Sequence, residues 1–190
     1  MAFISAGELN ERVQARELTF DAAENAWAWT TAWGAWVKAE QSDRTSYFSA
    51  VGIGARSVIF LMRKASRIHL GLSFLWRGQF CFLTSIADTE QPGIVEVKAA
   101  LCEPVECRKD ADLDPAGCSF PGVLTEKYFK NEPERPHTVT IVTYVLVTPK
   151  ALELDPGSLV DVGGKAYGVQ TCHTLDQWKN EYEILRKEDC

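Results

Sequence analysis

Alternating apolar and polar residues predict short β-strands along most of this chain. Residues 57–63 (SVIFLMR) form an apolar run of strand length. Residues 72–77 and 79–86 form two more strands around Arg77-Gly78, a pair typical of a hairpin turn. Residues 94–102 (IVEVKAALC) provide a return strand, so the first half is expected to consist of antiparallel strands.

The tryptophan-rich stretch NAWAWTTAWGAWVKAEQSDRTSY follows a strand predicted within residues 7–20 and a turn at 21–26. Trp27 and Trp29 are two residues apart and share one face of a strand, whereas Trp36 has the opposite parity. Aromatic residues on both faces favour the filling of a small barrel.

An exposed stacking surface needs basic residues among the rings, and only Lys38 and Arg44 lie nearby in the sequence. We therefore expect the tryptophans, Trp36 included, to lie in the interior. Residues 41–56 are too long for a plain hairpin, and Ser42 or Asp43 can cap a short helix there.

The second half begins with a segment of different character. Residues 104–136 are rich in proline, glycine and charge, which favours an extended connector or arm. Residues 138–148 then predict a strand, Gly163-Gly164 a hairpin turn, and EYEILR a final strand. The expected organisation is a β-barrel with a helix-bearing loop over residues 1–103, a connector over 104–136, and a second small β module over 137–190.

A weak internal repeat relates the two halves. The segments GLSFLWRG, from Gly71 to Gly78, and GSLVDVGG, from Gly157 to Gly164, align without gaps at an offset of 86 residues (157 − 71 and 164 − 78). This offset favours a partial duplication, although any two antiparallel meanders look alike at this level.

Composition and charge restrict the function. The chain has 190 residues, 46% of them hydrophobic, which excludes a mainly disordered protein. Its net charge of -6 opposes tight binding of nucleic-acid phosphates. The start, MAFISAGELNERV, lacks the features of an export signal, so we expect a soluble protein with reduced cysteines.

Candidate catalytic and metal-binding residues are few. Cys172 and His173 are the best nucleophile and base by type, but neighbours on a strand point to opposite faces. Glu181 and Glu183 share one face of the final strand, where a solvated edge is the expected role. The six cysteines have no regular spacing; a zinc site is an alternative that would use a histidine together with Cys102, Cys107 and Cys118. We expect no catalytic residues, cofactor or metal.

Several segments in order resemble the head-to-tail joining proteins of tailed bacteriophages, the head-closure (stopper) or head-tail adaptor family. They are GELNERV at 7–13, the spacing from Trp29 to Trp36, WRGQF at 76–80, SIAD at 85–88 and LCE at 101–103. The resemblance covers about residues 5–108, and the chain continues well past the usual closing strand.

The resemblance implies a structural virion protein without enzymatic activity. Such a protein forms a six- or twelve-fold ring in the phage neck after assembly in the host cytoplasm. Portal or adaptor proteins lie above the ring and a tail terminator or tail-completion protein lies below it. DNA passes through the lumen without specific binding, and no membrane is involved. A portal-proximal adaptor is the alternative to a stopper.

Within such a ring, the insertion at 41–56 is expected to narrow the channel or to pack on a neighbouring subunit. The candidate gating residues are Tyr47, Phe48, Gly52, Ile53 and Gly54, and the candidate contacts with a neighbouring subunit are Trp27 and Trp33. Two other functions stay open: a nucleic-acid-binding barrel of the OB type, which requires a basic face, and a hydrolase that uses Cys172 or His173.

Overall fold

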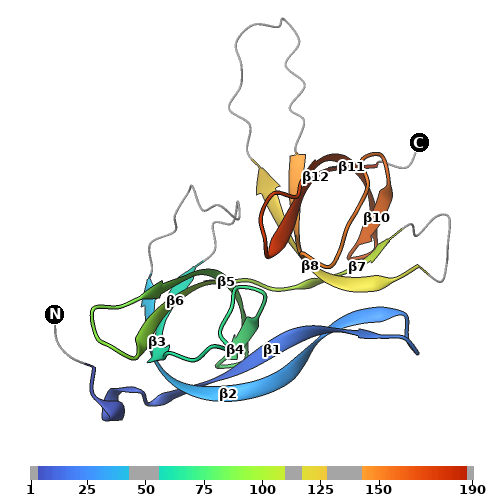
Figure 1. Ribbon diagram of the computed structural model, residues 1–190. Coiled ribbons are helices and arrows are strands. Elements are labelled where there is room, and N and C mark those ends of the chain that lie inside the picture. The colour runs from blue at the N-terminus through green and yellow to red at the C-terminus, as the bar shows by residue number, and fades with distance from the viewer. Residues whose placement is uncertain (1–3, 43–55, 110–116, 128–142, 188–190) are drawn as a thin grey trace, which may run out of the picture. The chain divides into compact units, whose positions relative to one another are not determined.

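A computed structural model describes residues 4–42, 56–109, 117–127 and 143–187 (Figure 1). The chain divides into two compact units. The first contains the described residues of 4–20, 28–42 and 56–103, and the second contains 21–27 and the described residues from 104 onward. In the part of the chain that the structure describes, no helix has the length and apolar character needed to cross a membrane.

The first unit is a closed ring of six antiparallel strands. They pair in the order β1-β4-β5-β6-β3-β2, and β2 returns to β1. Two meanders, β1-β2-β3 and β4-β5-β6, thus close on each other, so each of the six strands has a partner on both sides along part of its length. A short 3-10 helix precedes them; the elements are η1 (Ala6–Glu8), β1 (Glu11–Asp21), β2 (Ala26–Ser42), β3 (Ser57–Arg63), β4 (Ser73–Trp76), β5 (Gln79–Asp88) and β6 (Ile94–Leu101).

Alternation along the strands fills this ring. In β3, Val58, Phe60 and Met62 point inward and are almost completely buried. The ring of Phe60 lies 5.7 Å from those of Phe74 and Trp76, both in edge-on geometry. The inward positions thus form one aromatic core.

Glu11 fixes the turn between β4 and β5 to the start of β1. The turn residues Arg77 and Gly78 have φ values of 49° and 78°, the left-handed geometry of tight hairpins. One carboxylate oxygen of Glu11 accepts hydrogen bonds from the Trp76 indole nitrogen at 2.7 Å and from Arg77 Nε at 2.9 Å. The other accepts from the Arg77 guanidinium at 3.0 Å.

The second unit is also a closed ring of six antiparallel strands. Its order is β8-β7-β10-β11-β12-β9, and β9 returns to β8. The elements are β7 (Val105–Lys109), β8 (Ser119–Lys127), β9 (Thr143–Pro149), β10 (Leu159–Val162), β11 (Lys165–His173) and β12 (Lys179–Arg186). The prediction of an extended connector over residues 104–136 was wrong, because the strands β7 and β8 lie within this segment.

The two rings have the same topology. Replacing each strand of the first order by the strand six positions later gives the order of the second. The offset of 86 residues relates Ser73 to Leu159, the starts of β4 and β10. It also relates the register shift at Leu83/Ser85 to the one at Val169/Thr171. The repeat thus covers all six strands of each unit.

Polar groups close the interior of the second unit. The Asn180 side-chain amide donates to the carbonyls of Lys150 at 3.2 Å and Leu152 at 2.8 Å. The Tyr182 hydroxyl donates to Leu152 at 2.9 Å and accepts from the Leu154 amide at 3.1 Å. Because Asn180 and Tyr182 are fully buried, these bonds hold the irregular segment 150–154 against the ring.

Three sequence expectations have different outcomes. The mainly β fold with an antiparallel barrel is confirmed. The solvated edge expected for Glu181 and Glu183 is wrong, because β12 pairs with both β11 and β9. The helix expected in the loop falls on residues 43–55, outside the described residues.

Candidate functional site

The hairpin of β1 and β2 extends beyond the closed ring. β1 pairs with β4 from Val13 to Arg16, and β2 pairs with β3 from Val37 to Ser42. The remainder of the two long strands forms a ribbon (Figure 1), and Ala26 at its end also pairs in parallel with Ser119 of β8. Thr19 and Thr30 cross-link the ribbon through their hydroxyl groups, 3.3 Å apart.

The β2 strand carries no charged residue from position 26 to 37. The side chains of Trp29 and Trp33 face the interior of the barrel. The Trp29 indole lies 5.8 Å from the Phe80 ring, and the Trp33 indole lies 6.3 Å from the Phe74 ring. Trp36 faces the other way and is 59% exposed, so its expected interior position was wrong. The reason is geometric: a barrel strand has a single inner face, and Trp36 lies on the outer one.

A hollow of about 750 Å³ lies beside this part of β2. Its walls come from the N-terminal turn, from β2 and from the end of β3 with the loop that follows. The lining residues are Gly7, Leu9, Asn10, Trp33, Gly34, Ala35, Trp36, Met62, Arg63, Lys64, Ala65, Arg67 and Ile68. We call this hollow the Trp–Arg groove.

Strand register brings the basic residues of the groove to the tryptophans. Val37 lies opposite Met62, so Arg63, the last residue of β3, comes beside Trp36. The chain then turns, and the Arg67 guanidinium lies 4.2 Å from the centre of the Trp33 ring. This distance is that of a cation–π contact.

The groove lining contains three cationic residues and no acidic one. Lys64 forms an ion pair with Asp88 at 2.7 Å, outside the lining. The Trp33 indole nitrogen is buried and has no hydrogen-bond partner among the described residues. In a chain of net charge -6, the groove is therefore a local basic and aromatic surface.

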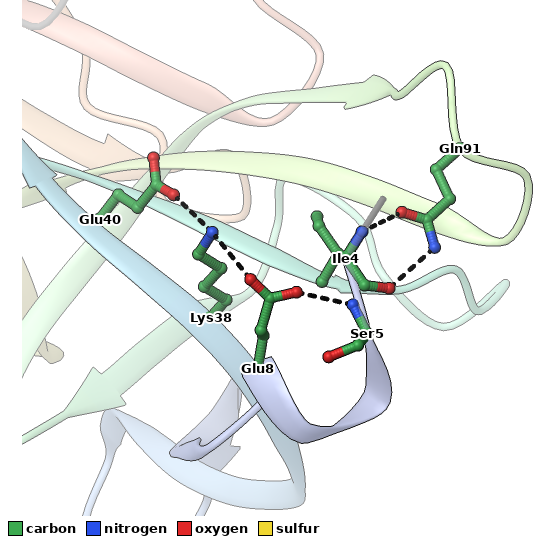
Figure 2. Close-up of polar contacts among 6 residues, drawn as sticks. All are labelled: Ile4, Ser5, Glu8, Lys38, Glu40 and Gln91. Atoms are coloured by element: carbon green, nitrogen blue, oxygen red, sulfur yellow. Dashed lines mark hydrogen bonds and ion pairs between the residues drawn. The ribbon is translucent and has the colours of Figure 1, made fainter. Parts of the chain in front are cut away.

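Polar contacts hold the N-terminal lip of the groove in place (Figure 2). The backbone of Ile4 and the Gln91 side chain exchange hydrogen bonds of 2.7 and 3.0 Å. Glu8 accepts from the Ser5 amide at 2.7 Å and pairs with Lys38 at 3.6 Å. These bonds lower the pKa of the exposed Glu8 carboxyl, the Ser5 amide most strongly.

The tip of the ribbon has the opposite charge. Residues 17–25 (ELTFDAAEN) contain three acidic residues and no basic one, and we call them the acidic finger. Phe20, near its end, is 47% exposed. Asp21 shapes the turn by accepting hydrogen bonds from the Ala23 and Glu24 amides at 2.8 and 3.4 Å.

The two candidate contact residues, Trp27 and Trp33, lie in different parts of the structure. Trp27 is half-buried on the ribbon, and Trp33 is half-buried in the wall of the groove. The five candidate gating residues, Tyr47, Phe48, Gly52, Ile53 and Gly54, lie outside the described residues. Sequence analysis missed Arg63 and Arg67, which lie far from the tryptophans along the chain.

The candidate nucleophile and base have separate partners. The Cys172 thiol donates to the Leu154 carbonyl at 3.4 Å, while His173 Nε2 lies 3.3 Å from a Glu183 carboxylate oxygen. Burial raises the pKa of the Cys172 thiol, which disfavours the thiolate that a nucleophile needs. Among residues 4–42, 56–109, 117–127 and 143–187, no three His, Cys, Asp or Glu side chains gather as metal ligands would.

Two buried thiols predict a loss of stability at alkaline pH. Burial raises the pKa of Cys81 and of Cys107 to about 12, from an ordinary 9.0. Above pH 9 the unfolded thiols ionise and the folded ones do not, so the stabilisation present below pH 9 is lost as pH rises. Urea unfolding at about pH 8 and about pH 10 should show a loss of about 1 kcal/mol for each thiol.

The matched variants Cys81→Ala and Cys107→Ala should each be less stable than the parent chain at the lower pH. Between the lower and the higher pH, however, each should lose less free energy of unfolding than the parent chain. An equal loss in the variants and the parent chain would show that other groups cause the alkaline effect.

Comparison of the chain with models of protein families, with characterised proteins and with solved structures gives no match.

Proposed function

We propose that this protein is a structural protein of a phage virion that forms a ring in the neck between portal and tail. The ring would close the DNA-filled capsid and offer a docking surface to the tail. The observation that carries the proposal is the uncharged segment of β2 with its exposed Trp36 and the adjoining groove, because exposed apolar residues of this kind mark sites of protein contact.

Two further features support this proposal. The segments that resemble head-to-tail joining proteins lie within the first unit, and this unit is the small closed β-barrel that the resemblance implies. The net charge of -6 suits a channel through which DNA slides, since a basic lumen would retain phosphates. The stopper and the portal-proximal adaptor are both compatible with these features.

A specific observation favours a second candidate function, the nucleic-acid-binding barrel. Sequence analysis found no basic face, but the fold brings Arg63, Lys64 and Arg67 around Trp33 and Trp36. Bases stack on exposed aromatic rings when cations line the same groove. Retention on immobilised oligothymidylate at moderate salt would favour this function over the first.

Electron microscopy tests the proposed function. In negative stain, the purified protein mixed with the portal and tail-completion proteins of the same phage should form rings with a central hole, bound to the portal. Particles that stay single and do not bind the portal would overturn the proposal. Oligothymidylate should leave these rings intact, because the proposed channel makes no specific contact with DNA.

A further inference from the structure

We propose that the acidic finger of one copy of this chain binds in the Trp–Arg groove of a second copy. This inference rests on the proposed ring and identifies the contact between its subunits. The two surfaces are complementary in charge: three acidic residues without a base on the finger, and three cations without an acid in the groove lining.

Two of the three large hydrophobic residues that are exposed in the described part of the chain lie at these two surfaces. Phe20, Trp36 and Leu175 are the large hydrophobic residues exposed among those the structure describes. Phe20 belongs to the finger and Trp36 to the groove. Each surface therefore combines an apolar residue with charges, and burying both together would remove two exposed aromatic rings from water.

Strand geometry prevents the two surfaces from meeting within one chain. The finger ends where β2 begins at Ala26, and the groove starts at Trp33 on the same continuous strand. An extended strand rises by about 3.3 Å per residue, so the tip of the finger at 21–25 lies roughly 25 Å from Trp33 along a paired ribbon. Glu17 lies nearer, because its carbonyl accepts a hydrogen bond from the Thr30 hydroxyl at 3.4 Å. The tip can reach only the groove of another copy, which makes the contact heterologous, the type that generates rings when the rotation closes.

The β2 backbone suits a polypeptide occupant. β3 ends at Arg63, opposite Trp36, and no other described strand of this unit continues it beside Trp33–Ala35. An edge with alternating N–H and C=O groups is complementary to another polypeptide chain, which presents both groups. A nucleic acid offers mostly acceptors on its backbone, so we place it among the outcomes of the test.

Charge reversal tests the contact by sedimentation over a range of protein concentrations. The finger variant is Glu17→Lys with Glu24→Lys, and the groove variant is Arg63→Glu with Arg67→Glu. The parent chain should self-associate, and each variant alone should associate at least about tenfold more weakly. An equimolar mixture should associate again, because each finger then meets a groove of opposite charge.

Matched controls separate this result from misfolding and from net charge. The control variant, Lys165→Glu with Lys187→Glu, adds as much negative charge as the groove variant but at exposed positions of the second unit. It should associate like the parent chain. Thermal unfolding should show that both reversal variants fold.

The outcomes distinguish the contact from the proposed function. Parent-like association of either variant, or a mixture of folded variants that does not associate, overturns the contact. Portal-bound rings formed by the reversal variants would then leave the proposed function standing. A parent chain that stays monomeric at every concentration also overturns the contact. Oligothymidylate binding that the groove reversal abolishes, with self-association unchanged, assigns the groove to nucleic acid instead.

Discussion

Replacing Phe60 by alanine is expected to lower the free energy of unfolding by about 3–5 kcal/mol. The Phe60 side chain is completely buried, and its ring lies 5.7 Å from those of Phe74 and Trp76. Alanine would leave a cavity at the centre of the first ring of strands, where the closed sheet has little freedom to collapse. Chemical denaturation followed by circular dichroism measures the change.

Trp36→Ala is the matched control, because it removes a larger aromatic ring from the outer face of the same unit. With 59% of the residue exposed, the change should cost less than about 1 kcal/mol. A loss from Trp36→Ala equal to that from Phe60→Ala would show that the inner and outer faces of the strands are assigned wrongly.

Asn180→Leu is expected to lower the free energy of unfolding by about 2–4 kcal/mol, the second largest effect. Leucine has a similar volume but leaves the Lys150 carbonyl without the amide, and the Lys150 ammonium loses an acceptor 3.2 Å away. The Leu152 carbonyl retains the Tyr182 hydroxyl. Urea unfolding of the whole chain measures the effect.

Tyr182→Phe and the double variant complete the test. Asn180 and Tyr182 both donate to the Leu152 carbonyl, so losing both donors leaves that buried oxygen with the longer hydrogen bond of 3.3 Å from the Thr148 hydroxyl. The double variant should therefore lose more stability than the two single variants predict together. Strict additivity would contradict a shared role in holding segment 150–154.

Local sequence patterns were sufficient for much of the fold. The strand predicted at 57–63 is β3, and the turn predicted at Arg77-Gly78 joins β4 to β5. These elements combine strong alternation with turn residues that tolerate positive φ. The offset of 86 residues located the repeat because Gly78 and Gly164 occupy matching hairpin turns, where their φ values of 78° and 81° favour glycine.

The residue types of β7 and β8 did not predict strands. β7 has only five residues, with charged side chains on both sides of Cys107. β8 contains Pro121 and Gly122, which usually argue against a strand. Here the missing side chain of Gly122 is required, because a Cβ would come within 2.7 Å of Leu146 and 2.9 Å of the Cys107 sulfur. Such close approach becomes visible only after the ring has closed.

The groove could not be predicted from neighbouring residues along the chain. Only Lys38 and Arg44 lie close to the tryptophans along the chain, whereas Arg63 reaches Trp36 through the register of β2 with β3. The loop after β3 then brings Arg67 over Trp33. Because the intervening segment 43–55 is long, no local periodicity fixes this register.

The unequal hairpins of the two rings determine the valence of the chain. β1 and β2 have 11 and 17 residues, whereas their counterparts β7 and β8 have five and nine. If both rings carried a long ribbon and a matching groove, each molecule could bind four others, and assembly would branch into a network. With one long ribbon in its described part, the chain has one donor and one acceptor surface. Polymerisation through these surfaces is unbranched and has a direction, so the duplicated barrel adds mass and surface to each subunit without adding a branch point.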